Sequence, residues 1–239
     1  ITYGLSKDAM VRADNIRHDK QNMVFDVIYA QKQIVKDVVI NLPGLHNVQN
    51  ALAAIAIGLE LGIDAAKIKQ GLKDFAGIGR RFNLSKNLSA KAGKFILVDD
   101  YAHHPTELTA AINACRGGWQ NKRLVVVFQP HRYSRTRDLF DEFTECLNHA
   151  DVLVMTDVYA AGEQPISGYS AADLCRSIRT RGKIDPIYIA NIANLTVDLH
   201  NIIEDDDLVL MVGAGSIGQV SKYIVANKGL NFDLTEGKA

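Results

Sequence analysis

The feature that most limits the fold of this chain is a regular alternation of short apolar runs and helix-like segments after residue 94. Each apolar run is followed by a segment whose apolar side chains recur at helical spacing. The predicted strand and helix pairs are 95–98 with 105–115, 124–128 with 136–149, 152–155 with 171–181, 187–189 with 193–203, and 208–212 with 217–225. Such an order is typical of a mostly parallel sheet flanked by helices. We therefore expect an α/β domain over residues 80–239.

The first third of the chain has a different pattern. Residues 1–40 are β-rich, with strands predicted at 23–29 and 34–40. After the break at Leu42-Pro43-Gly44, one apolar face predicts a helix over 47–61, and Asp64 can cap a shorter helix that ends near residue 75. A glycine-rich stretch at 77–81 then predicts a hinge or linker. These patterns divide the chain into domains at 1–79 and 80–239, and its start at Ile1, inside a predicted strand, suggests a piece of a longer protein.

Composition excludes several classes of partner. The net charge is zero, so no broad basic surface is available for nucleic acid or for an anionic membrane. No apolar run approaches the roughly 18 residues that a membrane-spanning helix needs, and no signal sequence is recognisable. Cys115, Cys146 and Cys175 are far apart, which favours buried thiols in a reducing cytoplasm over a zinc or redox site.

Polar side chains gather where the strand at 95–98 ends. Asp99, Asp100, Tyr101, His103 and His104 follow it, and Pro105 can open the next helix. Consecutive strand residues point to opposite faces, so the two acids should act differently. One can cap the helix, and the other can accept hydrogen bonds from sugar hydroxyls. Adjacent histidines on a turn rarely chelate one ion, so we predict no metal site here.

A second polar segment follows the strand at 124–128. Arg132 and Arg135 are three residues apart, a spacing that lets two guanidinium groups converge on one carboxylate or phosphate. Together with Arg137 they lie near a predicted helix start, where positive charge opposes the helix dipole. Because ligands of open α/β sheets bind beyond the carboxyl ends of strands, both segments predict an anion site.

Two further pairs allow either a structural or a ligand-binding role. Asn47 can cap the helix at 47–61, but capping does not explain Asn50, and two amides suit the edge of a heterocycle such as adenine. Arg80 and Arg81 are either solvated charges or phosphate contacts at a domain junction.

The segment Gly213-Ala214-Gly215-Ser216-Ile217-Gly218 matches the dinucleotide fingerprint. The next strand with its acidic ribose ligand does not follow in the remaining 21 residues, so a tight turn with close packing is favoured over a nicotinamide site. No P-loop sequence is present in the chain.

Together the motifs resemble the Mur ligase family, in the same order along the chain. The matching segments are 44–50, 79–82, 99–107, 128–136 and 157–163, with Ala102 where relatives commonly have glycine. The segments at 99–107 and 128–136 are most similar to the branch that adds L-alanine. The resemblance implies that residues 1–79 are the C-terminal part of a central ATP-binding domain. It implies that residues 80–239 are a Rossmann-like amino-acid-binding domain.

The resemblance also implies a reaction and a set of site residues. An ATP-dependent ligase of this branch joins L-alanine to the lactyl carboxylate of UDP-N-acetylmuramate through an acyl phosphate, in peptidoglycan precursor synthesis. The ATP contacts would be Asn47, Asn50, Arg81 (or Arg80) and, at the ribose, Asp100. The amino acid and the reacting carboxylate would meet Tyr101, His103, Arg132 and Arg135, with His103 and the two arginines in catalytic roles.

The P-loop, the Mg²⁺ ligands and the UDP-sugar domain would lie upstream, so this piece is expected to be inactive alone. Two other functions remain open at this point. One is a nucleotide-dependent oxidoreductase that uses the turn at 213–218, and the other is a non-catalytic nucleotide-binding module.

Overall fold

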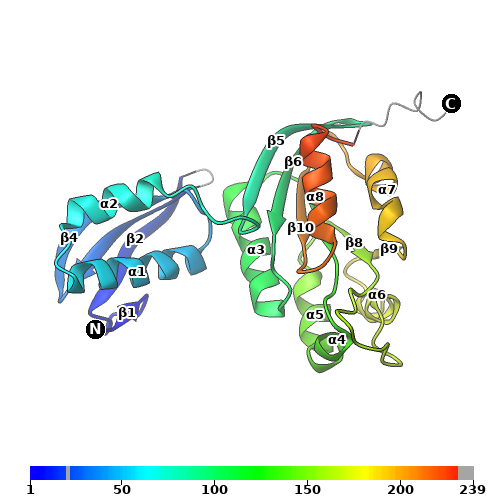
Figure 1. Ribbon diagram of the computed structural model, residues 1–239, viewed down its shortest axis with the longest axis horizontal. Helices are drawn as coiled ribbons and strands as arrows, with labels where there is room; N and C mark the ends of the chain where they lie inside the picture. The colour runs from blue at the N-terminus through cyan, green and yellow to red at the C-terminus, as the bar shows by residue number, and fades with distance from the viewer. Residues whose placement is uncertain (20–21, 231–239) are drawn as a thin grey trace. The chain divides into compact units, whose positions relative to one another are not determined.

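The computed structural model describes residues 1–19 and 22–230, which form two compact units (Figure 1). The first unit is Ile1–Ile78 together with Asn113–Gln120, and the second begins at Gly79. Each unit has its own sheet and its own hydrophobic core.

The first unit is a four-stranded sheet covered by two helices. Its elements are β1 (Tyr3–Gly4), β2 (Val11–Asp19), β3 (Asn22–Tyr29), β4 (Lys32–Ile40), α1 (Leu45–Glu60) and α2 (Ala65–Asp74). The sheet order is β1-β2-β3-β4, and β3 and β4 form an antiparallel hairpin. The predicted apolar face of α1 is confirmed, because Leu52, Ile55 and Ala56 are buried against the sheet. Asp64 caps α2 as predicted, accepting the backbone N–H groups of Ala66 and Lys67.

A buried carboxylate fixes the middle of this sheet. Asp26 on β3 accepts hydrogen bonds from Asn15 Nδ2 (2.7 Å), Gln33 Nε2 (3.1 Å) and the Asp37 backbone N–H (2.9 Å). Asn15 and Asp37 both have positive φ, at 49° and 51°, and the pairing register shifts beside each of them. A single side chain therefore holds two β-bulges, one in each neighbouring strand. The hydrogen bond from Asn15, followed by that from Asp37, lowers the pKa of Asp26 below its ordinary value of 3.8.

We expect Asp26→Ala to lower the free energy of unfolding by about 1–2 kcal/mol at neutral pH, since three donors lose a charged acceptor and, being on exposed residues, can turn to water instead. Because the folded pKa is depressed, this stabilisation is fully present above pH 3.8 and is lost as pH falls through the folded pKa. Urea unfolding from pH 7 to pH 3 should show the wild type and the variant converging in acid. The exposed Asp74→Ala is the control, and a difference that grows in acid would contradict this assignment.

The second unit is a six-stranded α/β sheet with the order β5-β6-β10-β7-β8-β9. Its elements are β5 (Asn83–Ala90), β6 (Gly93–Asp100), the first part of α3 (Pro105–Gly118, which passes into the first unit at Asn113), β7 (Leu124–Phe128), α4 (Tyr133–Asp138), α5 (Phe140–Leu147), β8 (Val152–Thr156), α6 (Ala171–Thr180), β9 (Ile187–Ile189), a 3-10 turn (Ile192–Asn194), α7 (Leu195–Ile202), β10 (Leu208–Val212) and α8 (Ile217–Ala226). All neighbouring strands run parallel except β5, which pairs antiparallel with β6. The predicted α/β class with a mostly parallel sheet is confirmed.

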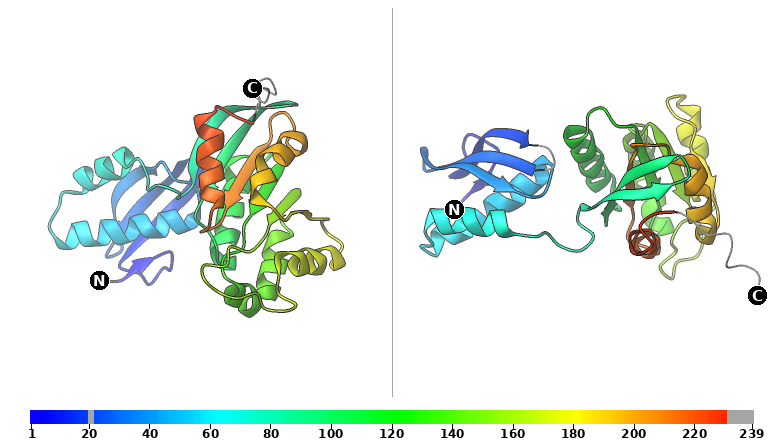
Figure 2. Two further views of the ribbon diagram at one scale, coloured as in Figure 1. Left: turned by 45° about the vertical axis from the view of Figure 1, so that its right-hand side comes forward. Right: turned by 90° about the horizontal axis from the view of Figure 1, so that it is seen from above.

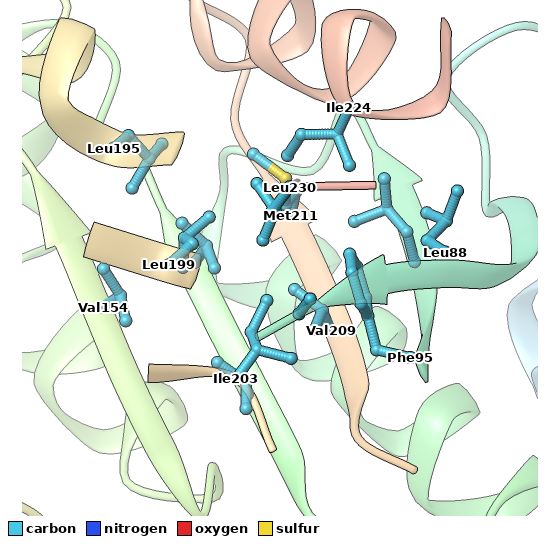
Figure 3. Packing of buried hydrophobic residues seen from close by; sticks show 14 of the residues in the cluster. Leu88, Phe95, Val154, Leu195, Leu199, Ile203, Val209, Met211, Ile224 and Leu230 are labelled. Atoms are coloured by element: carbon cyan, nitrogen blue, oxygen red, sulfur yellow. The ribbon is translucent and has the colours of Figure 1, made fainter. Parts of the chain in front are cut away.

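Helices cover both faces of this sheet (Figures 1 and 2). Figure 3 shows one face, where Leu195 and Leu199 of α7 and Ile224 of α8 form one apolar cluster with Val154 of β8 and with Val209 and Met211 of β10. On the opposite face Phe128 of β7 meets Phe143 of α5, with ring centroids 5.5 Å apart. Strands with both faces buried explain the unbroken apolar runs in the sequence.

The observed elements differ from the predicted ones at three places. Strand β5 was not predicted, because its sequence, Asn-Leu-Ser-Lys-Asn-Leu-Ser-Ala, is largely polar, as an edge strand allows. The single helix predicted at 136–149 is two helices, since Leu139 leaves the helical region (φ −123°, ψ 27°). The tail from Asn227 is polar and contains glycine, which predicts poor order, but this is wrong for 227–230: Gly229 pairs with Ser89 and Leu230 is buried. The remainder of that tail lies outside the described residues.

All three cysteines are buried, as predicted. Burial raises the pKa of Cys146 to about 12 and that of Cys175 to about 11. These two thiols are therefore protonated at neutral pH, which makes them poor nucleophiles.

Candidate functional site

The carboxyl ends of the central strands of the second unit lie side by side. Val212 at the end of β10 pairs in register with Asp100 of β6 and with Phe128 of β7, and Phe128 pairs with Met155 of β8. The segments that follow these four strands therefore emerge at one edge of the sheet. Polar side chains crowd this edge, which is where open α/β sheets place their ligands.

A row of four aromatic rings runs along this edge. The ring centroids of Tyr101 and His103 are 5.3 Å apart, and those of His103 and His131 are 5.9 Å apart. The His131 ring stacks on the Tyr159 ring, with a centroid distance of 5.3 Å and an angle of 14° between the ring planes. The row joins the segments after β6, β7 and β8. It brings the predicted residues Tyr101 and His103 beside the segment that carries the two predicted arginines.

The two acids at the end of β6 act differently, as predicted. Asp99 pairs with Arg80 at 3.3 Å, whereas Asp100 accepts the backbone N–H groups of Phe82 (2.8 Å) and Ala102 (2.7 Å). Burial raises the pKa of both carboxyl groups. The predicted helix-capping role belongs to neither acid, because Glu107 of α3 accepts the N–H groups at the helix start, from His103 and His104.

The adjacent arginines at the start of the second unit have separate environments. The Arg80 guanidinium binds Asp99 and donates to the carbonyl oxygen of Gly213 at 2.6 Å, and it lies 5.2 Å from the centre of the Tyr101 ring. Arg81 is exposed, and its guanidinium lies 5.8 Å from the same ring without an acceptor among the described residues. Arg80 is thus fixed inside the unit, and Arg81 is the one available to a ligand.

Arg135 is oriented by His131. Its Nη1 lies 3.2 Å from His131 Nδ1 and donates to the His131 carbonyl oxygen at 3.1 Å. A guanidinium cannot accept a hydrogen bond, so Nδ1 is the acceptor and the neutral ring carries its proton on Nε2. Burial, and then the positive charge of Arg135, lowers the pKa of His131, in agreement with a neutral ring. The other two guanidinium nitrogens of Arg135 have no acceptor within residues 1–19 and 22–230.

His131 is a further candidate site residue, which the sequence alone did not single out. It precedes Arg132 in the motif, but its role depends on contacts with Tyr159 and His103, which come from other strand ends. Arg132 itself is half-exposed, and its Nη1 pairs with Glu163 at 3.2 Å.

The glycines at 213–218 are explained by close packing, the structural alternative that the sequence favoured. A Cβ on Gly213 would lie 2.8 Å from the carbonyl oxygen of Gln129, one on Gly215 would meet the Gln129 side chain, and one on Gly218 would meet the Arg80 guanidinium. Gln129 Oε1 also accepts the N–H of Ile217, at the start of α8. This turn therefore serves the packing of neighbouring segments.

The two predicted adenine contacts lie in the first turns of α1, in the first unit. Asn47 donates from Nδ2 to the carbonyl oxygen of Pro43 at 2.8 Å, and Gly44 occupies the N-cap position. The capping role considered for Asn47 is therefore wrong, because its amide donates where a cap would accept. Asn50 is exposed, and no partner for its amide lies in the described part of the chain.

Residues 1–19 and 22–230 contain no helix with the length and apolar character that crossing a bilayer requires. No group of three or more His, Cys, Asp or Glu side chains in them is placed to hold a metal ion.

Several solved structures share this fold. The UDP-N-acetylmuramate-alanine ligase MurC from Thermotoga maritima matches with a TM-score of 0.77 and 26% identity, over 95% of this chain and 47% of that one. MurF from Acinetobacter baumannii matches with a TM-score of 0.68 and 21% identity, over 93% of this chain and 46% of that one. MurF ligase from Thermotoga maritima in complex with ADP matches with a TM-score of 0.66 and 14% identity, over 95% of this chain and 48% of that one. The chain spans about half the length of these proteins.

Family models match both units. The model described as "Mur ligase middle domain" matches residues 1–58, and that described as "Mur ligase, glutamate ligase domain" matches residues 80–215. Together with the shared fold, these matches show that the chain belongs to the Mur ligase family.

Proposed function

We propose that this chain is part of an ATP-dependent ligase that joins L-alanine to the lactyl carboxylate of UDP-N-acetylmuramate through an acyl phosphate. The observation that carries the proposal is Arg135, which is anchored by His131 and keeps two nitrogens open beside the row of aromatic rings. A guanidinium presented in this way suits the carboxylate of an amino acid. The 26% identity to the Thermotoga maritima MurC supports alanine as the amino acid.

The imidazole of His103, whose ring lies 5.9 Å from that of His131, is suited to the amine of the same substrate. His103 Nδ1 lies 2.9 Å from the carbonyl oxygen of Tyr101, which can only accept, so Nδ1 carries the proton and Nε2 is the free acceptor. Glu107 lies 3.5 Å from Nδ1, where it would stabilise the imidazolium. We assign His103 the role of taking a proton from the alanine ammonium, so that the free amine attacks the acyl phosphate. Arg132 and Arg135 neutralise the substrate carboxylate and the charge that develops during attack.

The nucleotide contacts are proposed residue by residue. The exposed amide of Asn50, with Asn47, is assigned to adenine, and the exposed guanidinium of Arg81 to the phosphates. Asp100 remains the proposed ribose contact. Each of its oxygens accepts one backbone N–H, which leaves further lone pairs for hydroxyl groups. ATP would supply the γ-phosphate that activates the lactyl carboxylate, and we assign none of the described residues to the accompanying Mg²⁺.

Each predicted domain would bind a different substrate. Residues 1–79 would be the C-terminal part of the ATP-binding domain, and residues 80–239 the amino-acid-binding domain. The ADP complex of the Thermotoga maritima MurF, which shares the fold, supports a nucleotide as a substrate.

The proposal is tested by following ADP release from the complete gene product with ATP, UDP-N-acetylmuramate and one amino acid at a time. We expect turnover with L-alanine to exceed that with D-alanine, glycine or L-serine. Discrimination against glycine is expected to be modest, about 10–200-fold, because a single methyl group is the only difference. Turnover without an amino acid requirement, or NADH binding in a fluorescence titration, would refute the assignment.

A further inference from the structure

Arg132 has an unfavourable backbone conformation. Its φ of 72° and ψ of 134° lie outside the regions that residues with a side chain ordinarily occupy. Such a conformation costs about 1–3 kcal/mol and persists only when the surroundings impose it. Outliers of this kind gather at binding sites, so the contacts that impose it are informative.

The segment 157–163, which follows β8, imposes this conformation on the backbone. The Arg132 N–H donates to the carbonyl oxygen of Tyr159 at 2.9 Å, and the Tyr159 N–H donates to the carbonyl oxygen of Pro130 at 2.8 Å. These two hydrogen bonds form a parallel β-bridge between His131 and Tyr159. The bridge continues the parallel pairing of β7 and β8 past the ends of both strands.

Glu163, in the same segment, holds the guanidinium of Arg132. Its carboxylate accepts the Ser134 backbone N–H at 2.9 Å, the Ser134 hydroxyl at 2.7 Å and Arg132 Nη1 at 3.2 Å. The hydrogen bond from the Ser134 backbone, followed by that from its hydroxyl, lowers the pKa of Glu163 to about 2. The acid is therefore ionised at any working pH. Both the backbone and the guanidinium of Arg132 are thus held by one segment.

We propose that Glu163 is a positioning residue, which aims the Arg132 guanidinium at the carboxylate of the incoming amino acid. This inference rests on the proposed function of the site. Glu163 engages only Nη1, and the other two nitrogens of Arg132 have no acceptor among the described residues. An arginine fixed in advance loses less conformational freedom when the substrate binds.

The chain contains a matched control for this role. Asp173 accepts the N–H and hydroxyl of Ser170 and pairs with Arg176 at 2.9 Å, the same three kinds of contact that Glu163 makes. That second acid–serine–arginine set caps α6. Asp173→Asn therefore reproduces the loss of charge and hydrogen bonds without touching Arg132.

The test compares Glu163→Gln with Asp173→Asn in the complete gene product. We expect Glu163→Gln to raise the KM for L-alanine about tenfold, the effect of weakening one charge-assisted contact, with the KM for ATP changed less than about twofold. Asp173→Asn should leave both constants unchanged. Equal KM values for L-alanine in the two variants would overturn the inference while leaving the proposed function intact. A wild type that does not consume L-alanine would overturn both.

A double-mutant cycle tests whether Glu163 acts through Arg132. If it does, Glu163→Gln adds nothing to the KM for L-alanine once Arg132→Ala is present. Additive effects would contradict a positioning role. Should Glu163→Gln fold poorly, Ser134→Ala removes one of the three hydrogen bonds and keeps the acid. It should then raise the same KM by about two- to threefold, in line with the loss of one hydrogen bond.

Discussion

Replacing Arg135 by alanine is expected to raise the KM for L-alanine roughly 100-fold in the complete gene product, because two charge-assisted hydrogen bonds to the substrate carboxylate are lost. The KM for ATP should change less than about threefold, since the variant removes no proposed nucleotide contact. Steady-state rates of ADP release, measured while one substrate is varied at a time, give both constants.

Arg137→Ala is the matched control for this prediction. Arg137 lies on the same short helix, but its guanidinium is exposed and pairs with the neighbouring Asp138. Its removal should leave the KM for L-alanine unchanged. Equal increases in the KM for L-alanine and for ATP in the Arg135 variant would refute the role assigned to Arg135.

The second large effect concerns stability. Arg80→Ala is expected to lower the free energy of unfolding by about 3–5 kcal/mol, the usual result of leaving one partner of a buried ion pair alone. The side chains of Arg80 and Asp99 are only 18% and 12% exposed, and Arg80 also satisfies the carbonyl oxygen of Gly213. Urea unfolding monitored by circular dichroism measures this loss.

Arg81→Ala separates stability from function at the adjacent position. Its guanidinium is exposed and has no hydrogen-bond acceptor among the described residues, so the change in unfolding free energy should stay within about 0.5 kcal/mol. If Arg81 contacts the phosphates as proposed, this variant instead raises the KM for ATP. Equal stability losses at the two positions would show that the structural division between the arginines is wrong.

The sheet of the second unit was predictable because its strands are buried on both faces. Runs such as the one that forms β7, Leu124–Phe128, are apolar throughout, and their alternation with helical spacing indicates a parallel sheet. Strand β5 followed no such rule, since an edge strand with polar residues resembles a loop. The break at Leu139 is set by tertiary packing, and its sequence offers no Gly or Pro as a signal.

The grouping of the candidate site residues was predictable as far as strand ends determine it. Tyr101, His103, Arg132 and Arg135 follow the ends of β6 and β7, and the strand order brings those ends to one edge. The partners His131 and Glu163 depend on how the segment after β8 pairs with the segment after β7, which no local pattern encodes. Equally, only the fold shows that Arg80 is buried against Asp99 while its neighbour Arg81 is exposed.

Every role proposed for these residues depends on the carboxyl edge of the second sheet binding the carboxylate of an amino acid. This binding is tested most directly by titrating the isotope-labelled protein with L-alanine and following backbone and arginine side-chain resonances by NMR. We expect shifts centred on Tyr101, His103, His131, Arg132 and Arg135, weaker shifts with D-alanine, and none in the Arg135→Ala variant. Shifts that map to other elements, or that persist unchanged in Arg135→Ala, would contradict binding at this edge.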